Sequence, residues 1–418
     1  MQPHPDIEGQ AELAAWKRVA EDAELQLLAR EAFRSGSGGP AVAAVARLRE
    51  RWDADLVRIA LQWMDARDRA AAKFSDAQRL TCDRQGVEQA TSESVGRWKA
   101  GRVAGARGRP LFDLCSGIGG DAMAFAAALG PERVHAVDRS PVRAWMAERN
   151  ARCRAIVADV TALPPEHDLA KAYVHLDPAR REEERGSRPL TPIHVPPLEA
   201  CAELASRAAG AAIKLGPGLE PAVLPMEAGL EWISERGTLV QLVAWCGELA
   251  AGAETRPGER RATMVDRAGH VSLVHRGTPP APPCRGDGDM GRFLFVPDPA
   301  LERSRLHGVL AGERGLAEPV ERLGLLTGDE AVTSPWLAGF EILERLRPEE
   351  RRVAAALRAL GAGEVRVRTR GGSADADAWT RSLRRGLAVG GATYDVFLLR
   401  LGAERAAFVT RATSSPVA

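Results

Sequence analysis

Several features that would point to a secreted, membrane-bound or metal-binding protein are missing from the sequence. The six cysteines have no paired spacing, which argues against a disulfide framework and against a zinc site. No apolar run reaches about 18 residues, and the N-terminus lacks the basic-then-apolar pattern of a secretory signal. We therefore expect a soluble, cytoplasmic protein that binds no metal and no membrane. The cysteines are Cys82, Cys115, Cys153, Cys201, Cys246 and Cys284.

The chain also lacks an excess of either charge. It has 57 Lys and Arg against 56 Asp and Glu, a formal charge of +1, so no global field indicates a nucleic-acid partner. Lysine is scarce among the basic residues, and genome base composition explains this most simply because Ala and Gly are abundant too. The lysines are Lys17, Lys73, Lys99, Lys171 and Lys214.

The size and composition are those of an ordinary globular protein. Apolar residues make up 45% and charged residues 27% of the 418 residues. A chain of this length is too long for one ordinary core, so two or three domains are expected. The composition of residues 278–289, TPPAPPCRGDGD, predicts a linker between two of them.

The clearest motif is LFDLCSGIGGD, residues 111–121. A short apolar strand is predicted to end at Asp113, a turn of small residues follows with Gly117, Gly119 and Gly120, and a helix begins after it. Glycines at such a turn permit positive φ and let a ligand lie directly on backbone N–H groups at the helix start. The pattern predicts a nucleotide-type site, although a glycine-rich turn alone also occurs in ordinary loops.

Three further aspartates follow predicted strands. Asp138 ends RVHAVD, twenty-five positions after Asp113, where a carboxylate suits two ribose hydroxyls. Asp159 follows the strand in CRAIVADV, and Asp177 follows the strand in AYVHLDPARR. Each of them, taken singly, is more often a helix cap or a turn residue. Four aspartates that each follow or end a predicted strand indicate one edge of a parallel sheet, the edge where α/β proteins bind ligands.

These motifs resemble those of a known family. EQATS, CSGIGGD, DPARR and LTGDEAVTSPW resemble bacterial class I S-adenosylmethionine-dependent methyltransferases with a THUMP-like C-terminal domain, over roughly residues 75–415. The Thr-x-Glu-x-Val segment that precedes the first strand is also distantly similar to trimethylguanosine synthase-like enzymes. The resemblance implies an α/β fold with a Rossmann-like, seven-stranded sheet ending in an antiparallel pair. It further implies an N-terminal helical region (1–105), a methyltransferase domain (106–280) and a small α+β THUMP-like domain (288–418).

The N-terminal region is predicted to be helical from about residue 11 to residue 100. Apolar residues such as Leu56, Ile59 and Trp63 recur at helical spacing with charges between them, and SGSGGP at 35–40 breaks the pattern. Two interpretations stay open for this region. It is either a cap packed over the methyltransferase core or a substrate-binding element.

The resemblance implies roles for single residues. Asp113 would shape the glycine turn and reach the methionine amino group of S-adenosylmethionine, Asp138 would bind the ribose, and Asp159 would bind the adenine amine. The cofactor-binding set that it implies is Thr91, Asp113, Cys115, Gly117, Gly119, Gly120, Asp121, Asp138 and Asp159.

Two members of this set have plainer interpretations. The turn around Thr91 would lie against the methionine end of the cofactor, but Thr91 or Ser92 could be only the cap of a helix. Cys115 lies inside the glycine turn, where we expect a small filler against the cofactor rather than a nucleophile.

Asp177-Pro178 is the candidate catalytic motif for the expected methyl transfer. Methyl transfer from a sulfonium is an in-line displacement, so the protein mainly holds two reactants at near-attack distance, without a metal or a covalent intermediate. Methyltransferases that act on exocyclic base nitrogens carry Asp or Asn, Pro, Pro and an aromatic residue here. This chain has Ala179-Arg180, so Asp177 can orient an amine but no ring follows to stack on a base. We predict Asp177, Pro178 and Arg180 as catalytic, with Arg180 or Arg181 stacking on a base or holding a phosphate.

Other basic residues are candidates for substrate contacts. Lys214, at the end of a fifth predicted strand, could meet a substrate phosphate or could be merely solvated. From residue 341 to the C-terminus there are 14 Arg against 9 acidic residues. Arg366, Arg368 and Arg370 place alternate side chains on one face of a strand, which is either a solvated face or a phosphate-binding one.

The prediction is an S-adenosylmethionine-dependent methyltransferase that acts on RNA, with the C-terminal domain helping to hold the RNA. Two alternatives remain. The missing aromatic residue after Asp177-Pro178 suggests a catalytically silent protein that binds cofactor and RNA. The nearly neutral charge leaves open a small-molecule methyltransferase.

Overall fold

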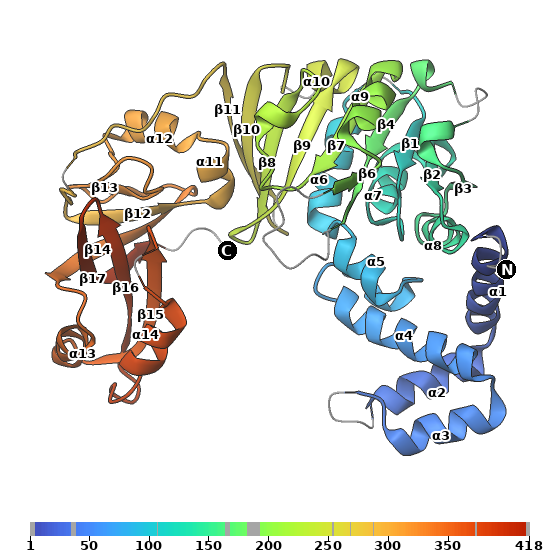
Figure 1. The fold of residues 1–418 in the computed structure, drawn as a ribbon, viewed down its shortest axis with the longest axis horizontal. Coiled ribbons are helices and arrows are strands. Elements are labelled where there is room, and N and C mark those ends of the chain that lie inside the picture. The colour runs from blue at the N-terminus through green and yellow to red at the C-terminus, as the bar shows by residue number, and fades with distance from the viewer. Residues whose placement is uncertain are drawn as a thin grey trace. The chain divides into compact units, whose positions relative to one another are not determined.

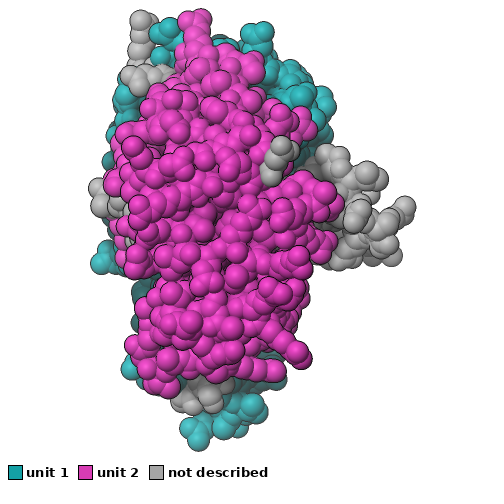
Figure 2. All heavy atoms as spheres, turned by 90° about the vertical axis from the view of Figure 1, so that its left-hand side faces the viewer, with its two compact units in different colours: residues 1–230, 241–258 teal, residues 231–240, 259–418 magenta. Residues whose placement is uncertain are grey.

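A computed structural model gives the structure of the protein and divides it into two compact units. The first comprises residues 1–230 and 241–258, and the second comprises residues 231–240 and 259–418 (Figure 2). The structure describes residues 5–34, 39–106, 108–163, 168–181, 193–252, 255–267, 269–286, 288–372 and 374–414.

The N-terminal region is helical, as predicted (Figure 1). Its core contains the Trp16 and Trp63 rings, whose centroids are 5.8 Å apart. The same core includes Ile118 of the glycine turn and Met146 of a later helix, so the helices pack against the methyltransferase core. The helices are α1 (Pro5–Glu21), α2 (Ala23–Arg34), α3 (Val42–Arg51), α4 (Ala54–Ala70), α5 (Arg84–Gln89) and α6 (Glu93–Ala104).

A sheet of nine described strands follows, in the order β11-β10-β8-β9-β7-β4-β1-β2-β3. The strands β3, β2, β1, β4 and β7 run parallel, while β9 is antiparallel to β7. The predicted hairpin forms the antiparallel pair β10–β11. The strands are β1 (Leu111–Leu114), β2 (Val134–Asp138), β3 (Arg154–Val157), β4 (Tyr173–Leu176), β7 (Gly210–Leu215), β8 (Gly229–Glu235), β9 (Thr238–Cys246), β10 (Glu259–Val265) and β11 (His270–Arg276).

The Rossmann-like architecture is confirmed, and the described strands number two more than the seven expected. The sequence did not predict β8, GLEWISE, because buried polar residues interrupt its apolar pattern. Glu231 accepts a hydrogen bond from Thr263 Oγ1 at 2.6 Å, and the Ser234 hydroxyl donates to Asp298 at 2.7 Å. Both side chains are fully buried, so the tertiary partners make this strand possible.

Helices lie between β1 and β2, between β2 and β3 and between β4 and β7, as in a doubly wound fold (Figure 1). After β1 the chain moves to β2 on one side, and later strands add on the other side at β4. The crevice at this reversal, beyond the carboxyl ends of the strands, is where such folds bind ligands. These helices are α7 (Gly120–Leu129), α8 (Pro141–Ala151) and α9 (Leu198–Arg207), while α10 (Gly247–Gly252) follows β9.

The second unit contains a six-stranded sheet, in the order β13-β12-β14-β17-β16-β15. The predicted helix–strand–helix–strand order is confirmed by α13 (Glu350–Ala359), β15 (Ala362–Arg370), α14 (Ala376–Leu383) and β16 (Ala392–Leu401). The remaining elements are β12 (Phe293–Pro297), β13 (Leu326–Gly328), β14 (Leu337–Leu346), β17 (Glu404–Ser414), α11 (Pro299–Arg303) and α12 (His307–Arg314). In the part of the chain described, no helix combines the length and apolar character needed to cross a membrane.

Candidate cofactor and active site

The glycine turn after β1 has the left-handed backbone that its sequence predicts. Gly117 has φ 56° and Gly119 has φ 82°, whereas Gly120 already begins α7. A Cβ added at Gly119 would lie 2.9 Å from Cα of Ala147, so α8 packs too closely for any side chain. A Cβ added at Gly117 would meet no atom within 4 Å. The turn therefore leaves open space at Gly117, where a ligand can approach the backbone.

Cys115 precedes these glycines and also has a positive φ, 62°. Burial raises the pKa of its thiol, with nearby carboxylates adding to the effect. A protonated thiol is a poor nucleophile, and the role of Cys115 as a small filler against the cofactor stays a prediction.

Asp138 is bound to the glycine turn. Its Oδ2 accepts a hydrogen bond from the Gly117 N–H at 3.0 Å, and its Oδ1 accepts one from the Ser140 N–H at 2.9 Å. Burial raises the pKa of Asp138, while these two hydrogen bonds work in the opposite direction. Each carboxylate oxygen keeps a further lone pair, so the group can still accept two hydroxyls.

Asp159 is exposed and caps a short 3-10 helix (Val160–Ala162). Its Oδ1 accepts hydrogen bonds from Oγ1 of Thr161 at 2.7 Å and from the Thr161 N–H at 2.9 Å. These two bonds lower the pKa of Asp159. Its capping role is present in the structure, and its contact with adenine stays a prediction.

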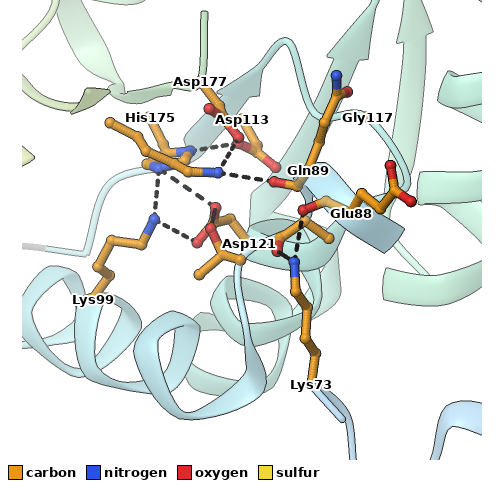
Figure 3. A network of polar contacts seen from close by, with 12 residues as sticks. Lys73, Glu88, Gln89, Lys99, Asp113, Gly117, Asp121, His175 and Asp177 are labelled. Carbon is orange, nitrogen blue, oxygen red and sulfur yellow. Dashed lines mark hydrogen bonds and ion pairs between the residues drawn. The ribbon is translucent and has the colours of Figure 1, made fainter. Parts of the chain in front are cut away.

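Four charged or polar side chains form a buried cluster beneath the glycine turn (Figure 3). The Nδ1 of His175 lies 2.6 Å from Oδ1 of Asp113, and its Nε2 lies 3.1 Å from Nζ of Lys99. The Lys99 ammonium lies 2.7 Å from Oδ1 of Asp121. None of the four side chains is more than 5% exposed. The cluster links α6, β1, α7 and β4 through buried charged and polar side chains.

Burial and charge act differently on the two carboxylates of this cluster. Burial raises the pKa of Asp113, and the hydrogen bond with His175 offsets only part of this. Burial acts in the same direction on Asp121, but the neighbouring positive charges, chiefly that of Lys99, outweigh it and lower the pKa. The positive charges thus favour the ionised form of Asp121. For Asp113, burial favours the protonated form, and the hydrogen bond with His175 opposes this.

Thr91 belongs to this cluster and is not a helix cap. Its hydroxyl donates to Oδ2 of Asp121 at 2.7 Å, and Thr91 is buried. Ser92 occupies the N-cap position of α6 but makes no capping hydrogen bond with its side chain. The capping interpretation is therefore wrong for both side chains.

Two buried polar atoms at the glycine turn fit a polar ligand such as S-adenosylmethionine. Asp113 Oδ2 and Ser116 Oγ are buried, and neither has a hydrogen-bond partner among the described residues. Unsatisfied buried polar atoms are costly and commonly mark a ligand site. Together with the open space at Gly117, they suit an ammonium group and a bound nucleoside.

Asp177 and Lys214 form an ion pair at the same edge of the sheet. Their Oδ2 and Nζ atoms lie 2.6 Å apart, and the Lys214 ammonium also donates to the Gln89 carbonyl at 3.2 Å (Figure 3). The Asp177 N–H donates to Leu114 O at 3.1 Å, which places it beside the end of β1. Lys214 is thus paired within the chain, and its contact with a substrate phosphate stays a prediction.

Pro178 follows Asp177 and leads into β5 (Ala179–Arg181), which pairs with β6 (Ile193–Val195). Arg180 and Arg181 lie in this strand, and their side chains lie outside the described residues.

The three arginines of β15 are each paired with a carboxylate. Arg366 lies 3.9 Å from Glu364, Arg368 lies 2.8 Å from Asp395, and Arg370 lies 3.0 Å from Glu302. The guanidinium of Arg368 also lies 5.4 Å from the ring centroid of Phe340. The face is therefore less basic than the sequence suggested, and part of it stabilises the sheet.

Sequence reasoning missed Lys73, Lys99 and His175. Lys73 donates to three carbonyls at the end of α5, those of Val87, Glu88 and Ala90, at 2.8–2.9 Å. With Lys214, three of the five lysines contact this site. No local pattern marked them, because their partners lie far away in the sequence.

The fold and this site define a class I methyltransferase, and comparison with known proteins places the chain in that class. The chain belongs to the S-adenosylmethionine-dependent methyltransferases. It is 31% identical over 363 residues to an uncharacterized S-adenosylmethionine-dependent methyltransferase found in two strains of Mycobacterium tuberculosis, which covers 84% of this chain and 94% of the relative. The cofactor is therefore S-adenosylmethionine, as predicted.

Two further comparisons concern the fold. A solved structure from Porphyromonas gingivalis, assigned to the methyltransferases, matches with a TM-score of 0.69 at 14% identity and covers 97% of this chain and 99% of that one. Residues 337–412 match the family model described as THUMP domain-like. The resemblance to a methyltransferase with a THUMP-like C-terminal domain is confirmed, while the likeness to trimethylguanosine synthase-like enzymes stays a prediction.

Proposed function

We propose that the protein methylates RNA. The observation that carries this proposal is the THUMP domain-like match at residues 337–412, in the same chain as a methyltransferase. Such a domain suggests RNA binding, and the local excess of arginine over acidic residues supports contact with phosphates. The three-part division into residues 1–105, 106–280 and 288–418 belongs to this proposal.

The cofactor would be held by the turn between β1 and α7. Asp113 Oδ2 would receive the amino group of the methionine part, and Asp138, fixed by two backbone N–H groups, would accept the ribose hydroxyls. Asp159, two residues beyond β3, would reach the adenine amine. The open space at Gly117 supports backbone contact with the ligand.

Asp177 would orient the nucleophile. It follows β4 and is tied by its N–H to the end of β1, so its carboxylate is at the edge where Asp113 and Asp138 also lie. S-adenosylmethionine supplies an electrophilic methyl group for an in-line displacement. The protein then contributes position and exclusion of water, and Asp177 accepts a hydrogen bond from the attacking group.

A catalytically silent cofactor- and RNA-binding protein is the second candidate. Ala179 stands where base-nitrogen methyltransferases carry the second proline, and Arg180 stands where they carry the aromatic residue that stacks on the base. A small-molecule substrate is the third candidate, because the net charge of +1 provides no long-range attraction for a polyanion.

The deciding experiment is transfer of a tritiated methyl group to total RNA from cells that lack the gene. Wild-type protein and Asp177→Ala would be compared, with calorimetric binding of S-adenosylhomocysteine measured on both. Label that requires Asp177 supports an RNA methyltransferase, and nucleoside digestion then identifies the methylated atom. Intact binding without label would favour the silent protein or a non-RNA substrate.

A further inference from the structure

The contacts within the buried cluster of Asp113, His175, Lys99 and Asp121 assign the tautomer of its histidine. An ammonium group has three donors and no acceptor, so Lys99 can only donate to Nε2 of His175, 3.1 Å away. The Nε2 atom must then be unprotonated, and the ring proton must lie on Nδ1. From there it is donated to Oδ1 of Asp113, 2.6 Å away.

One oxygen of the cluster is left without a partner. The buried Oδ2 of Asp113 has no hydrogen-bond partner among the described residues, although Oδ1 of the same carboxylate contacts His175. A single cationic donor at Oδ2 would satisfy this oxygen and favour the ionised form of Asp113, against the burial that raises its pKa.

We propose that Lys99 and His175 are positioning residues for the cofactor: Lys99 donates to Nε2 of His175 and so places the ring proton on Nδ1, and His175 holds the Asp113 carboxylate so that Oδ2 remains available to the ammonium group of S-adenosylmethionine. This inference rests on the proposed assignment of Asp113 to that group. Neither residue touches the reacting atoms, and both act through Asp113.

Removing Lys99 would remove the donor to Nε2 of His175. With Lys99→Met, no ammonium would remain at Nε2 to keep the ring proton on Nδ1, and Nε2 lies 3.8 Å from Oδ2 of Asp121. In the other tautomer Nδ1 carries no proton and cannot donate to Asp113, so the carboxylate would lose the contact that orients Oδ2. Binding of the ligand would then weaken.

Calorimetry with two ligands tests the proposal in the full-length protein. S-adenosylhomocysteine carries the ammonium group, and 5′-methylthioadenosine lacks the whole amino-acid part. We expect His175→Phe and Lys99→Met to weaken the binding of S-adenosylhomocysteine about ten- to a hundredfold, as for the loss of a charge-assisted hydrogen bond, while binding of 5′-methylthioadenosine stays within about twofold. A misfolded variant would lose both ligands.

Two variants refine the test. His175→Asn keeps an N–H donor close to the position of Nδ1 and should retain most of the S-adenosylhomocysteine affinity. His135→Phe is the matched control, because His135 lies on the neighbouring strand, packed on Phe112. This substitution should leave the affinity for both ligands unchanged.

Rescue by the conservative variant separates a positioning role from a purely structural one. His175→Asn should bind S-adenosylhomocysteine at least about tenfold more tightly than His175→Phe. Equal affinities in these two variants would overturn the proposal.

Asp113→Asn separates the role of Asp113 from the roles of His175 and Lys99. If Asp113→Asn leaves the preference for S-adenosylhomocysteine over 5′-methylthioadenosine unchanged, the assignment of Asp113 itself fails. If Asp113→Asn removes this preference and His175→Phe does not, only the roles of His175 and Lys99 are refuted.

Discussion

The ammonium of Lys214 lies 2.6 Å from Oδ2 of Asp177, with 13% and 29% of the two side chains exposed. Lys214 also donates to the Gln89 carbonyl, so one lysine links β7, the loop after β4 and the end of α5. An Asp held in this way has one oxygen committed to an ion pair, which limits the rotation of its carboxylate. The other oxygen is thereby set in one orientation.

Loss of Lys214 should therefore impair turnover more than cofactor binding. We expect Lys214→Met to lower kcat about tenfold or more, because Asp177 would no longer be held in a productive orientation. The calorimetric affinity for S-adenosylhomocysteine should stay within about threefold. Lys214→Arg keeps the charge and should recover part of the loss. A wild-type kcat in Lys214→Met, in the RNA labelling assay, would remove Lys214 from the mechanism.

The Asp177 carboxylate itself should be required for methyl transfer. Asp177→Ala is expected to abolish turnover while binding of S-adenosylhomocysteine remains, because the side chain is assigned to the nucleophile and not to the cofactor. Glu199, an acidic residue in the first turn of α9, offers a control as Glu199→Ala. Full activity of Asp177→Ala would refute the role of the Asp-Pro motif.

Asp138 should contribute to cofactor affinity through its ribose contact. Asp138→Ala is expected to weaken binding by roughly 1–3 kcal/mol, the value of charge-assisted hydrogen bonds. The Gly117 and Ser140 N–H groups would lose their acceptor in the same variant, so thermal unfolding should be recorded alongside calorimetry. Unchanged affinity would remove Asp138 from the ribose site.

The glycine at position 119 should be needed for stability. Gly119 has φ 82°, and an added Cβ would approach Cα of Ala147 to 2.9 Å, so Gly119→Ala should cost roughly 1–3 kcal/mol of unfolding free energy. Gly101 is the matched control. It lies within α6, and a Cβ there meets nothing within 4 Å, so Gly101→Ala should be neutral or stabilise by about 0.4–1 kcal/mol. Equal effects in denaturant titrations would contradict the argument.

Two arginines of β15 should differ in their effects. Arg368 pairs with Asp395, whose side chain is only 4% exposed, so Arg368→Ala would leave a buried carboxylate unpaired. We expect Arg368→Ala to cost about 1–3 kcal/mol of stability. Arg366 is exposed and pairs loosely with Glu364, so Arg366→Ala should leave the unfolding free energy within about 0.5 kcal/mol. If Arg366 contacts RNA, the salt dependence of RNA binding should become less steep in that variant.

The sequence by itself determined the features that depend on a few consecutive residues. The glycine turn could be predicted because positive φ favours glycine at residues 117 and 119, and the strand–turn–helix order follows from local patterning. The aspartates at strand ends could be placed on one edge because parallel strands end together. The class of protein and its cofactor followed from the family resemblance that these local motifs carry.

The tertiary structure decided which charged groups meet. His175 is 76 positions from Lys99 and 62 from Asp113, and Lys214 is 125 positions from Gln89. No local pattern marks such pairs, because a lysine or a histidine in a sequence carries no sign of its partner. Burial makes the pairing obligatory: a charge removed from water is tolerated only where another part of the chain supplies its counterpart, and only the folded chain brings the two together.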